Sequence, residues 1–177
     1  MPVSLNLKMD LLNFIVMENK IQLWSAPAVS AETYNDITVA VNHSDISNLT
    51  DQQKNQIIAA FQAGAYDMAT GYTWNKAMVK LKELLGSLGG DFISDMLQRN
   101  DINDFSSIEN VLSDIDAILL SEKLGILSSE GAMQLRHAKE QLSFYFSTQA
   151  EEQSAQLGPI HALAIIADSV KHILSIE

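Results

Sequence analysis

The chain has 177 residues, and 47% of them are apolar, which suits a single domain with a sizeable hydrophobic core. Acidic side chains outnumber basic ones 22 to 11, so the formal net charge is -11 and the chain repels phosphate backbones and anionic lipid. These values disfavour nucleic acid and membrane surfaces as partners. The absence of cysteine excludes disulfides, thiolate nucleophiles and cysteine-held metal clusters.

No apolar run approaches the roughly 18 residues that a membrane span needs. The apolar segment 11–17 lacks the preceding basic cluster of a signal peptide. No internal repeat or long linker divides the sequence. We therefore expect one cytoplasmic, all-α domain over residues 1–177, built as a bundle of about five to seven helices.

Residues 1–49 have the least decisive pattern. Alternation at Val3, Leu5 and Leu7 resembles a strand, although the apolar residues around 7–15 also suit a helix. Ile37 and Val41 fit a helix capped by Ser30 about as well as they fit a strand. We favour helices here, with a minor β element as the alternative.

Residues 50–85 carry stronger helical signals. Thr50 and Gln53 stand at capping-box spacing. The apolar positions that follow recur every three or four residues, and they are Ile57, Phe61, Ala65, Met68, Tyr72, Trp74, Met78, Leu81 and Leu85. This pattern predicts one long helix, or two helices joined near Gly71. The glycines at 86, 89 and 90 mark the end.

Three further helical segments follow in the chain. A short helix is expected over 91–98, burying Phe92, Ile93, Met96 and Leu97. Ser106 and Glu109 predict a capping box for a helix that ends at Gly125, with Ser113 and Asp116 as an alternative restart after a break. The apolar stripe expected to be buried on this segment is Ile108, Val111, Leu112, Ile115, Ile118 and Leu119. Ser128 or Ser129 then caps a helix whose expected core includes Met133, Leu135, Leu142 and Phe146, and residues 148–156 form a surface connection.

The last helix is the most apolar. Gly158 and Pro159 suit the N-cap and the first helical position. Its wide apolar stripe indicates either a central core helix, which we favour, or half of an interface. The candidate interface residues are Ile160, Leu163, Ile166, Ala167, Val170, Ile173 and Leu174.

The sequence contains no complete motif for catalysis, metal binding or phosphate binding. None of the four histidines has a glutamate three residues before it, so the carboxylate-histidine pattern of di-iron bundles is absent. Asp168 with His172, and His137 with Glu140, are each at most a two-ligand half-site. No phosphate-binding loop or nucleophile elbow occurs. We assign no catalytic, metal or cofactor residue.

Charge offers two further surfaces. Lys76, Lys80 and Lys82 beside Trp74 resemble the parts of an RNA patch, but a solvated lysine face with Trp74 in the core is the favoured interpretation. Acidic residues cluster between 91 and 116, where a basic partner would meet them; they are Asp91, Asp95, Asp101, Asp104, Asp114 and Asp116.

By elimination, the sequence predicts a non-enzymatic interaction or regulatory module that binds a protein partner or a second copy of itself. One alternative is an acidic neutraliser of a basic partner, of the immunity type. The other is an enzyme whose site the fold assembles in a way that the sequence does not display.

Overall fold

The computed structural model describes residues 31–42, 46–104 and 106–176, and it describes side chains from residue 36 onward. All regular structure in these ranges is helical, which confirms the predicted class. The patterns considered for residues 3–15 lie outside the described residues. No helix of the described ranges is long and apolar enough to cross a membrane.

Nine α-helices and a terminal π-helical turn make up the described chain, more than the five to seven helices expected. Their bounds are α2 Ala31–Val41, α3 Asp51–Gln62, α4 Tyr66–Gly86, α5 Gly90–Leu97, α6 Ile108–Val111, α7 Asp114–Lys123, α8 Ser129–Tyr145, α9 Thr148–Glu152, α10 Pro159–Ser169 and η1 Val170–Leu174. The additional helices arise for two reasons. The helices expected over 50–85 and 106–125 are each broken once, and α9 occupies part of the predicted surface connection.

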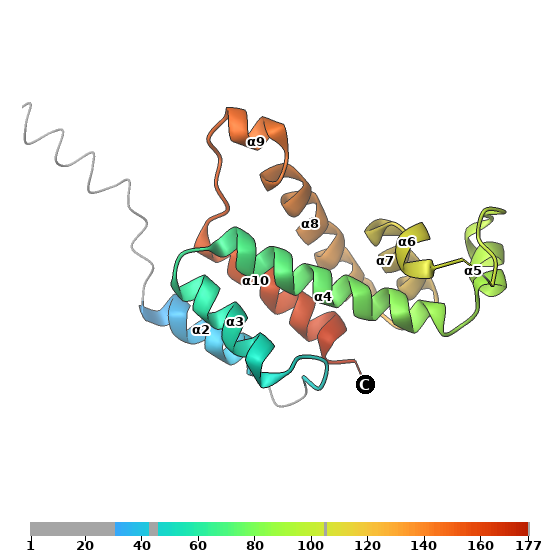
Figure 1. Ribbon diagram of the computed structural model, residues 1–177, viewed down its shortest axis with the longest axis horizontal. Helices are drawn as coiled ribbons and strands as arrows, with labels where there is room; N and C mark the ends of the chain where they lie inside the picture. Colours follow the sequence, from blue (N-terminus) through green and yellow to red (C-terminus); the bar gives the residue numbers. More distant parts are fainter. Residues whose placement is uncertain (1–30, 43–45, 105, 177) are drawn as a thin grey trace, which may run out of the picture. The chain divides into compact units, whose positions relative to one another are not determined.

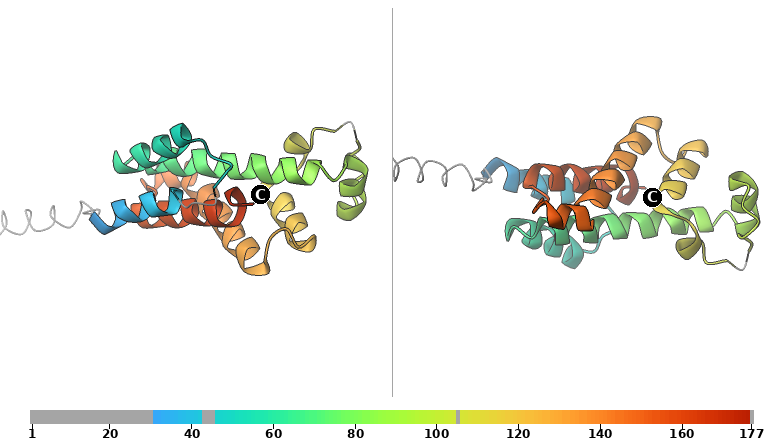
Figure 2. Two further views of the ribbon diagram at one scale, coloured as in Figure 1. Left: turned by 90° about the horizontal axis from the view of Figure 1, so that it is seen from below. Right: turned by 90° about the horizontal axis from the view of Figure 1, so that it is seen from above.

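Helices α4 and α10 run side by side through the bundle (Figure 1). Helices α2 and α3 pack beside them, α8 contacts α10, and α7 packs on both α4 and α8 (Figure 2). The largest fully buried side chains come from these helices, from α5 and from η1; they are Ile37, Ile57, Phe61, Leu81, Leu85, Ile93, Ile118, Leu120, Leu135, Ile165, Ile166 and Ile173. This single core orients the helix faces that form the site described below.

Several helix starts lie where the sequence predicts them. The backbone N–H of Gln53 donates to the Thr50 hydroxyl, and the Gln53 side chain accepts from the Thr50 backbone, which completes the capping box. Ser128 caps α8 by accepting from the Gly131 backbone N–H at 3.1 Å. Helix α10 begins with Gly158 as N-cap and Pro159 in its first turn.

Two predicted helix boundaries are wrong. The break after α3 falls at Gly64, whose φ of +79° is the left-handed conformation that glycine adopts without a Cβ clash, whereas Gly71 lies inside α4. The proposed Ser106–Glu109 capping box does not form, because the Ser106 hydroxyl instead bonds to Asn103. The alternative restart is confirmed: Ser113 caps α7 and accepts from the Asp116 backbone N–H.

The last helix changes its hydrogen-bond pattern near its end. The Ser175 N–H donates to the Val170 carbonyl at 3.0 Å, five residues back, which defines the π-helical turn η1. The Asn48 side-chain amide then donates to the carbonyls of Leu174 and Ile176 at 2.9 and 2.8 Å. A loop from the first part of the described chain thereby satisfies carbonyls at the end of the last helix.

Some large side chains expected in the core are exposed instead; they are Met68, Tyr72, Phe92, Leu119, Met133 and Phe146. In α4, for example, the buried face contains small and polar residues such as Ala69 and Thr73, and Met68 and Tyr72 lie on the opposite side. Helical periodicity identifies a stripe of residues, but the neighbouring helices determine which edge of that stripe is covered. The exposed residues on α4 and α8 therefore become candidates for a binding surface.

Candidate functional site

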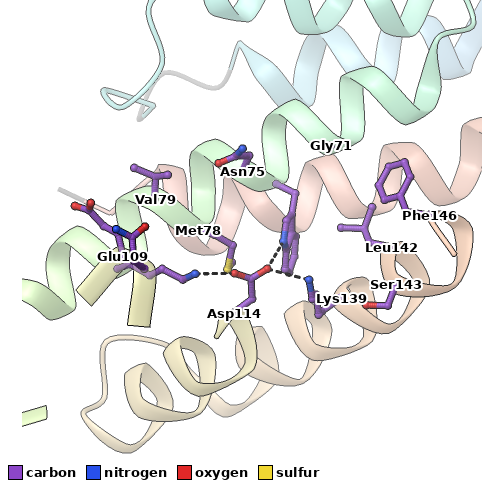
Figure 3. A pocket seen from close by; sticks show the side chains of 13 residues that line it. Gly71, Asn75, Met78, Val79, Glu109, Asp114, Lys139, Leu142, Ser143 and Phe146 are labelled. Carbon is purple, nitrogen blue, oxygen red and sulfur yellow. Dashed lines mark hydrogen bonds and ion pairs between the residues drawn. The ribbon is translucent and has the colours of Figure 1, made fainter. Parts of the chain in front are cut away.

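A pocket of about 790 Å³ opens between α4 and α8, with α6 and the start of α7 closing one side (Figure 3). Its lining residues are Gly71, Trp74, Asn75, Met78, Val79, Lys82, Glu109, Asn110, Asp114, Lys139, Leu142, Ser143 and Phe146. The pocket combines charged, aromatic and aliphatic side chains from four helices. We take this cavity as the candidate site.

Asp114 is the centre of the polar part of this pocket, where three dashed lines converge (Figure 3). Its Oδ2 accepts a hydrogen bond from the indole Nε1–H of Trp74 at 3.0 Å. Its Oδ1 lies 2.9 Å from the Lys82 ammonium, and Oδ2 lies 3.0 Å from the Lys139 ammonium. One carboxylate therefore joins α4, α7 and α8.

Local sequence explains the position of this carboxylate. Ser113 is the N-cap of α7, so Asp114 is the first helical residue, where the positive end of the helix dipole favours an anion. Trp74 and Lys82 stand eight residues apart on α4 and approach Asp114 from the same helix, while Lys139 approaches from α8. The cap thus places an acidic residue at the junction of the three helices.

Two positively charged lysines surround the single carboxylate of Asp114. Partial burial would raise the pKa of the Asp114 carboxyl, but the hydrogen bonds from Trp74, Lys82 and Lys139 together outweigh burial and hold that pKa below its ordinary value. Asp114 is therefore ionised at neutral pH. It balances one of its two ammonium neighbours, so the three side chains carry one surplus positive charge inside an acidic protein.

The α8 side of the pocket changes from charged to apolar along one helix face. Lys139, Leu142 and Phe146 follow one another at spacings of three and four residues and all line the cavity. Phe146 lies opposite Gly71 of α4, where an added Cβ would come 3.6 Å from the Phe146 ring. The Phe146 ring therefore lies close against the α4 backbone at Gly71, while 55% of Phe146 as a whole remains exposed.

The lysine cluster considered from the sequence is divided by the structure. Lys82 turns inward to Asp114, with 12% of its side chain exposed, so the solvated-face interpretation is wrong for this residue. Lys76 lies over the Tyr72 ring at 5.8 Å. Trp74 is buried, as expected. Trp74, which was considered as the stacking ring of an RNA patch, instead forms part of the pocket wall.

The structure also distributes the acidic cluster. Asp91, Asp95 and Asp104 are exposed around α5 and the loop after it. Asp101 is paired with Arg99, whose hydrogen bond lowers the pKa of that carboxyl. The remaining two lie on α7: Asp114 belongs to the pocket, and Asp116 accepts from the Ser113 hydroxyl. Of this acidic cluster, the residues around α5 are therefore the ones that present exposed carboxylates in no ion pair with a described residue.

The candidate interface residues of the last helix have mixed positions. Four of the seven, Ile166, Val170, Ile173 and Leu174, are buried within the bundle. Leu163 and Ala167 are half-buried. Ile160, at the start of α10, is 76% exposed. An interface here would use the first turns of the helix, and it stays a prediction.

The histidines do not assemble a site in the described part of the chain. His137 lies 3.9 Å from Glu140 on the surface. The His172 ring packs against Gly131, and its Nε2 lies 2.6 Å from the Gln134 side-chain oxygen. Burial, followed by the charge of Lys171, lowers the pKa of His172. Across the described residues, no three histidine, aspartate or glutamate side chains are placed to share one metal ion.

The Asp114 cluster was not predicted from the sequence. The available signal was the Ser113 cap, which positions Asp114, together with Trp74 and Lys82 on the preceding helix. No family model matches this sequence, and neither a curated protein nor a solved structure matches it, so the geometry of the pocket is the basis for a functional argument.

Proposed function

We propose that the protein is a non-enzymatic interaction module that binds a partner protein along the outer face of α4. The supporting observation is an exposed stripe on that helix, formed by Met68, Tyr72, Asn75 and Val79 at spacings of four, three and four residues. Three of these four side chains are large and apolar. Such a stripe has the spacing of the anchor residues through which an amphipathic helix contacts an apolar surface of another protein.

The stripe borders the pocket and extends its apolar surface. Asn75 and Val79 line the cavity, and exposed Phe146 continues the surface from α4 to the end of α8. Surface patches of this kind, apolar and rimmed by polar residues, are typical of protein contact sites. A partner side chain that entered the pocket would contact Leu142 and the exposed part of Phe146, which supplies an anchoring position.

Net charge selects the kind of partner. Two copies of a chain with a formal charge of -11 repel each other, whereas a basic protein is attracted at long range. We therefore commit to a heterologous partner that presents an apolar segment within a basic surface. A homo-oligomer is the competing outcome of the experiment.

The test compares two matched substitutions in the full chain. Val79→Asp places a charge on the stripe, and Ile160→Asp makes the same kind of change at an exposed residue of α10. Partners captured by each variant from source cells are quantified against the wild type, with equal thermal stability verified by circular dichroism. The proposal expects one basic protein to be lost with Val79→Asp and retained with Ile160→Asp. Equal capture by both variants, or a dimer in light scattering that Val79→Asp dissociates, would overturn it.

A second candidate function, neutralisation of a basic partner, is supported by the carboxylates around α5. Asp91, Asp95 and Asp104 are exposed there and make no ion pair with a described residue. Binding through this surface would weaken steeply with salt, since exposed charges are screened within about 10 Å at 0.1 M ionic strength. A complex that survives high salt but is lost with Val79→Asp would exclude this candidate.

A further inference from the structure

We infer that the pocket between α4 and α8 binds a small amphipathic organic carboxylate, with the carboxylate near Lys139 and Lys82 and the apolar body along Leu142 and Phe146. This assignment goes beyond the proposed protein interaction and does not depend on it. The two proposed contacts share Asn75, Leu142 and Phe146, but the ligand's carboxylate would lie at Lys82 and Lys139, which do not belong to the stripe.

Two lysine ammonium groups meet one aspartate carboxylate in the pocket. Lys82 and Lys139 share one carboxylate, Asp114, and each ammonium carries three N–H donors. Asp114 is the acceptor found for each of them among the described residues. Lys82 is nearly buried, and charge in such a place is stabilised by a second anion. An arriving carboxylate would meet unused N–H donors of both ammonium groups at the end of the pocket where Lys139 lies.

Two neutral hydrogen-bond donors and one acidic residue also line the pocket. The Asn75 amide and the Ser143 hydroxyl line the same cavity and can donate to a carboxylate. Glu109 also lines the cavity and is exposed at the side away from Phe146. Its negative charge opposes an anionic ligand, and its position favours a ligand body that extends the other way, toward Phe146 (Figure 3).

The end of the pocket beyond Lys139 is apolar. Along the α8 face, the charge of Lys139 is followed by the aliphatic Leu142 and then by the exposed ring of Phe146. The ring lies against Gly71 on one side, and the exposed remainder of Phe146 is the surface that a ligand can contact. A volume of about 790 Å³ is within the range of roughly 300–1,000 Å³ that is usual for small-molecule pockets. A phenyl or short alkyl group therefore fits beside Phe146.

The test measures binding of three probes that share one apolar body: 3-phenylpropionate, 3-phenylpropanamide and 3-phenylpropylammonium. The readout is the NMR signal of the Trp74 indole N–H, which donates to Asp114 within the pocket. Trp24 is replaced by phenylalanine so that one indole signal remains. We expect the carboxylate to bind about fivefold more tightly than the amide, which corresponds to about 1 kcal/mol for two charges 4 Å apart in water. We expect the ammonium probe to bind more weakly than the amide.

Charge variants identify the residues responsible. Lys139→Gln should abolish most of the preference for carboxylate over amide, and Lys139→Arg should retain it. Lys123→Gln removes an equal charge from an exposed position of α7 and is the matched control. Glu109→Gln should strengthen carboxylate binding by a smaller factor.

Three outcomes would overturn the inference: no shift of the Trp74 signal with any probe, equal affinity for carboxylate and amide, or equal effects of Lys139→Gln and Lys123→Gln. None of these measurements involves the partner capture that tests the proposed protein interaction, so either proposal can fail while the other stands.

Discussion

Replacing Asp114 by alanine tests the central structural claim, that one carboxylate joins three helices. The substitution removes the acceptor of the Trp74 indole N–H and the counterion of Lys82 and Lys139. Trp74 is 6% exposed, so its N–H would lose its partner where water has little access. Lys82 would keep its charge in a nearly buried position.

The magnitude follows from the groups left behind. An unsatisfied buried donor costs about 1–3 kcal/mol, and more when the group is charged. Lys139 contributes less, because 34% of its side chain is exposed and it can turn to water. We expect Asp114→Ala to lower the free energy of unfolding by about 3 kcal/mol in total. For a chain of this length, that loss corresponds to a melting temperature lower by roughly 6–12 °C.

The assay is urea unfolding followed by far-ultraviolet circular dichroism, with the wild type, Asp114→Ala, Asp114→Asn and Asp95→Ala measured in parallel. Asparagine keeps an oxygen that can accept from Trp74 and loses only the charge, so its cost should be about half that of alanine. Asp95 is an exposed aspartate outside the pocket, and its removal should change stability by less than about 0.5 kcal/mol. If Asp114→Ala costs no more than Asp95→Ala, the carboxylate does not hold the helices together and the reasoning is wrong.

Three other changes have defined outcomes in the same unfolding assay. Gly90→Ala should cost about 1–3 kcal/mol or more, because its Cβ would overlap the backbone carbonyl of Asn103; a neutral result would contradict that close approach. Leu119→Ala should cost less than about 1 kcal/mol, since Leu119 is 39% exposed, whereas a cost of 2–5 kcal/mol would restore the core assignment made from its apolar stripe. Burial lowers the pKa of His172 in the folded chain below the ordinary value of about 6.5 that it has in the unfolded chain, so the unfolded chain binds the proton more readily. The free energy of unfolding should therefore fall as the pH drops from 7.5 toward the folded pKa. His172→Gln should flatten this dependence, and an unchanged pH profile would contradict it.

Local signals in the sequence predicted much of the helical architecture. The caps at Thr50, Ser113 and Ser128 were identifiable because a side chain and a backbone group only a few residues apart satisfy each other. The same holds for Gly125, which adopts a φ of +73° after α7. These interactions are completed within one turn of chain and need no tertiary contact.

Tertiary contacts determine what the sequence did not predict. The break at Gly64 rather than Gly71 depends on α3 folding back against α4. Leu119 belongs to an apolar stripe but lies at its edge, where no described helix covers it completely. Periodicity alone does not contain this information, since a partly covered helix and a fully covered one share the same repeat.

The candidate site was beyond sequence reasoning for a related reason. Asp114 and Lys139 are 25 residues apart, and Trp74 precedes Asp114 by 40. Aspartate and lysine are common residues, so neither spacing is informative before the helices are packed. The sequence also does not show that Lys82 points inward to Asp114, because it lies in the same lysine-rich segment as Lys76 and Lys80, which was interpreted as a solvated face.

The central position of α10 bears on how the chain folds during synthesis. Helix α10 contacts α2, α4 and α8, yet it follows all of them in the sequence. Until it leaves the ribosome, the faces of those helices that it covers remain in water, and such exposed apolar surface promotes aggregation. Nascent chains arrested before residue 159 should therefore recruit chaperones and be sensitive to protease, and protection should appear only once α10 and the carbonyls bonded by Asn48 have emerged.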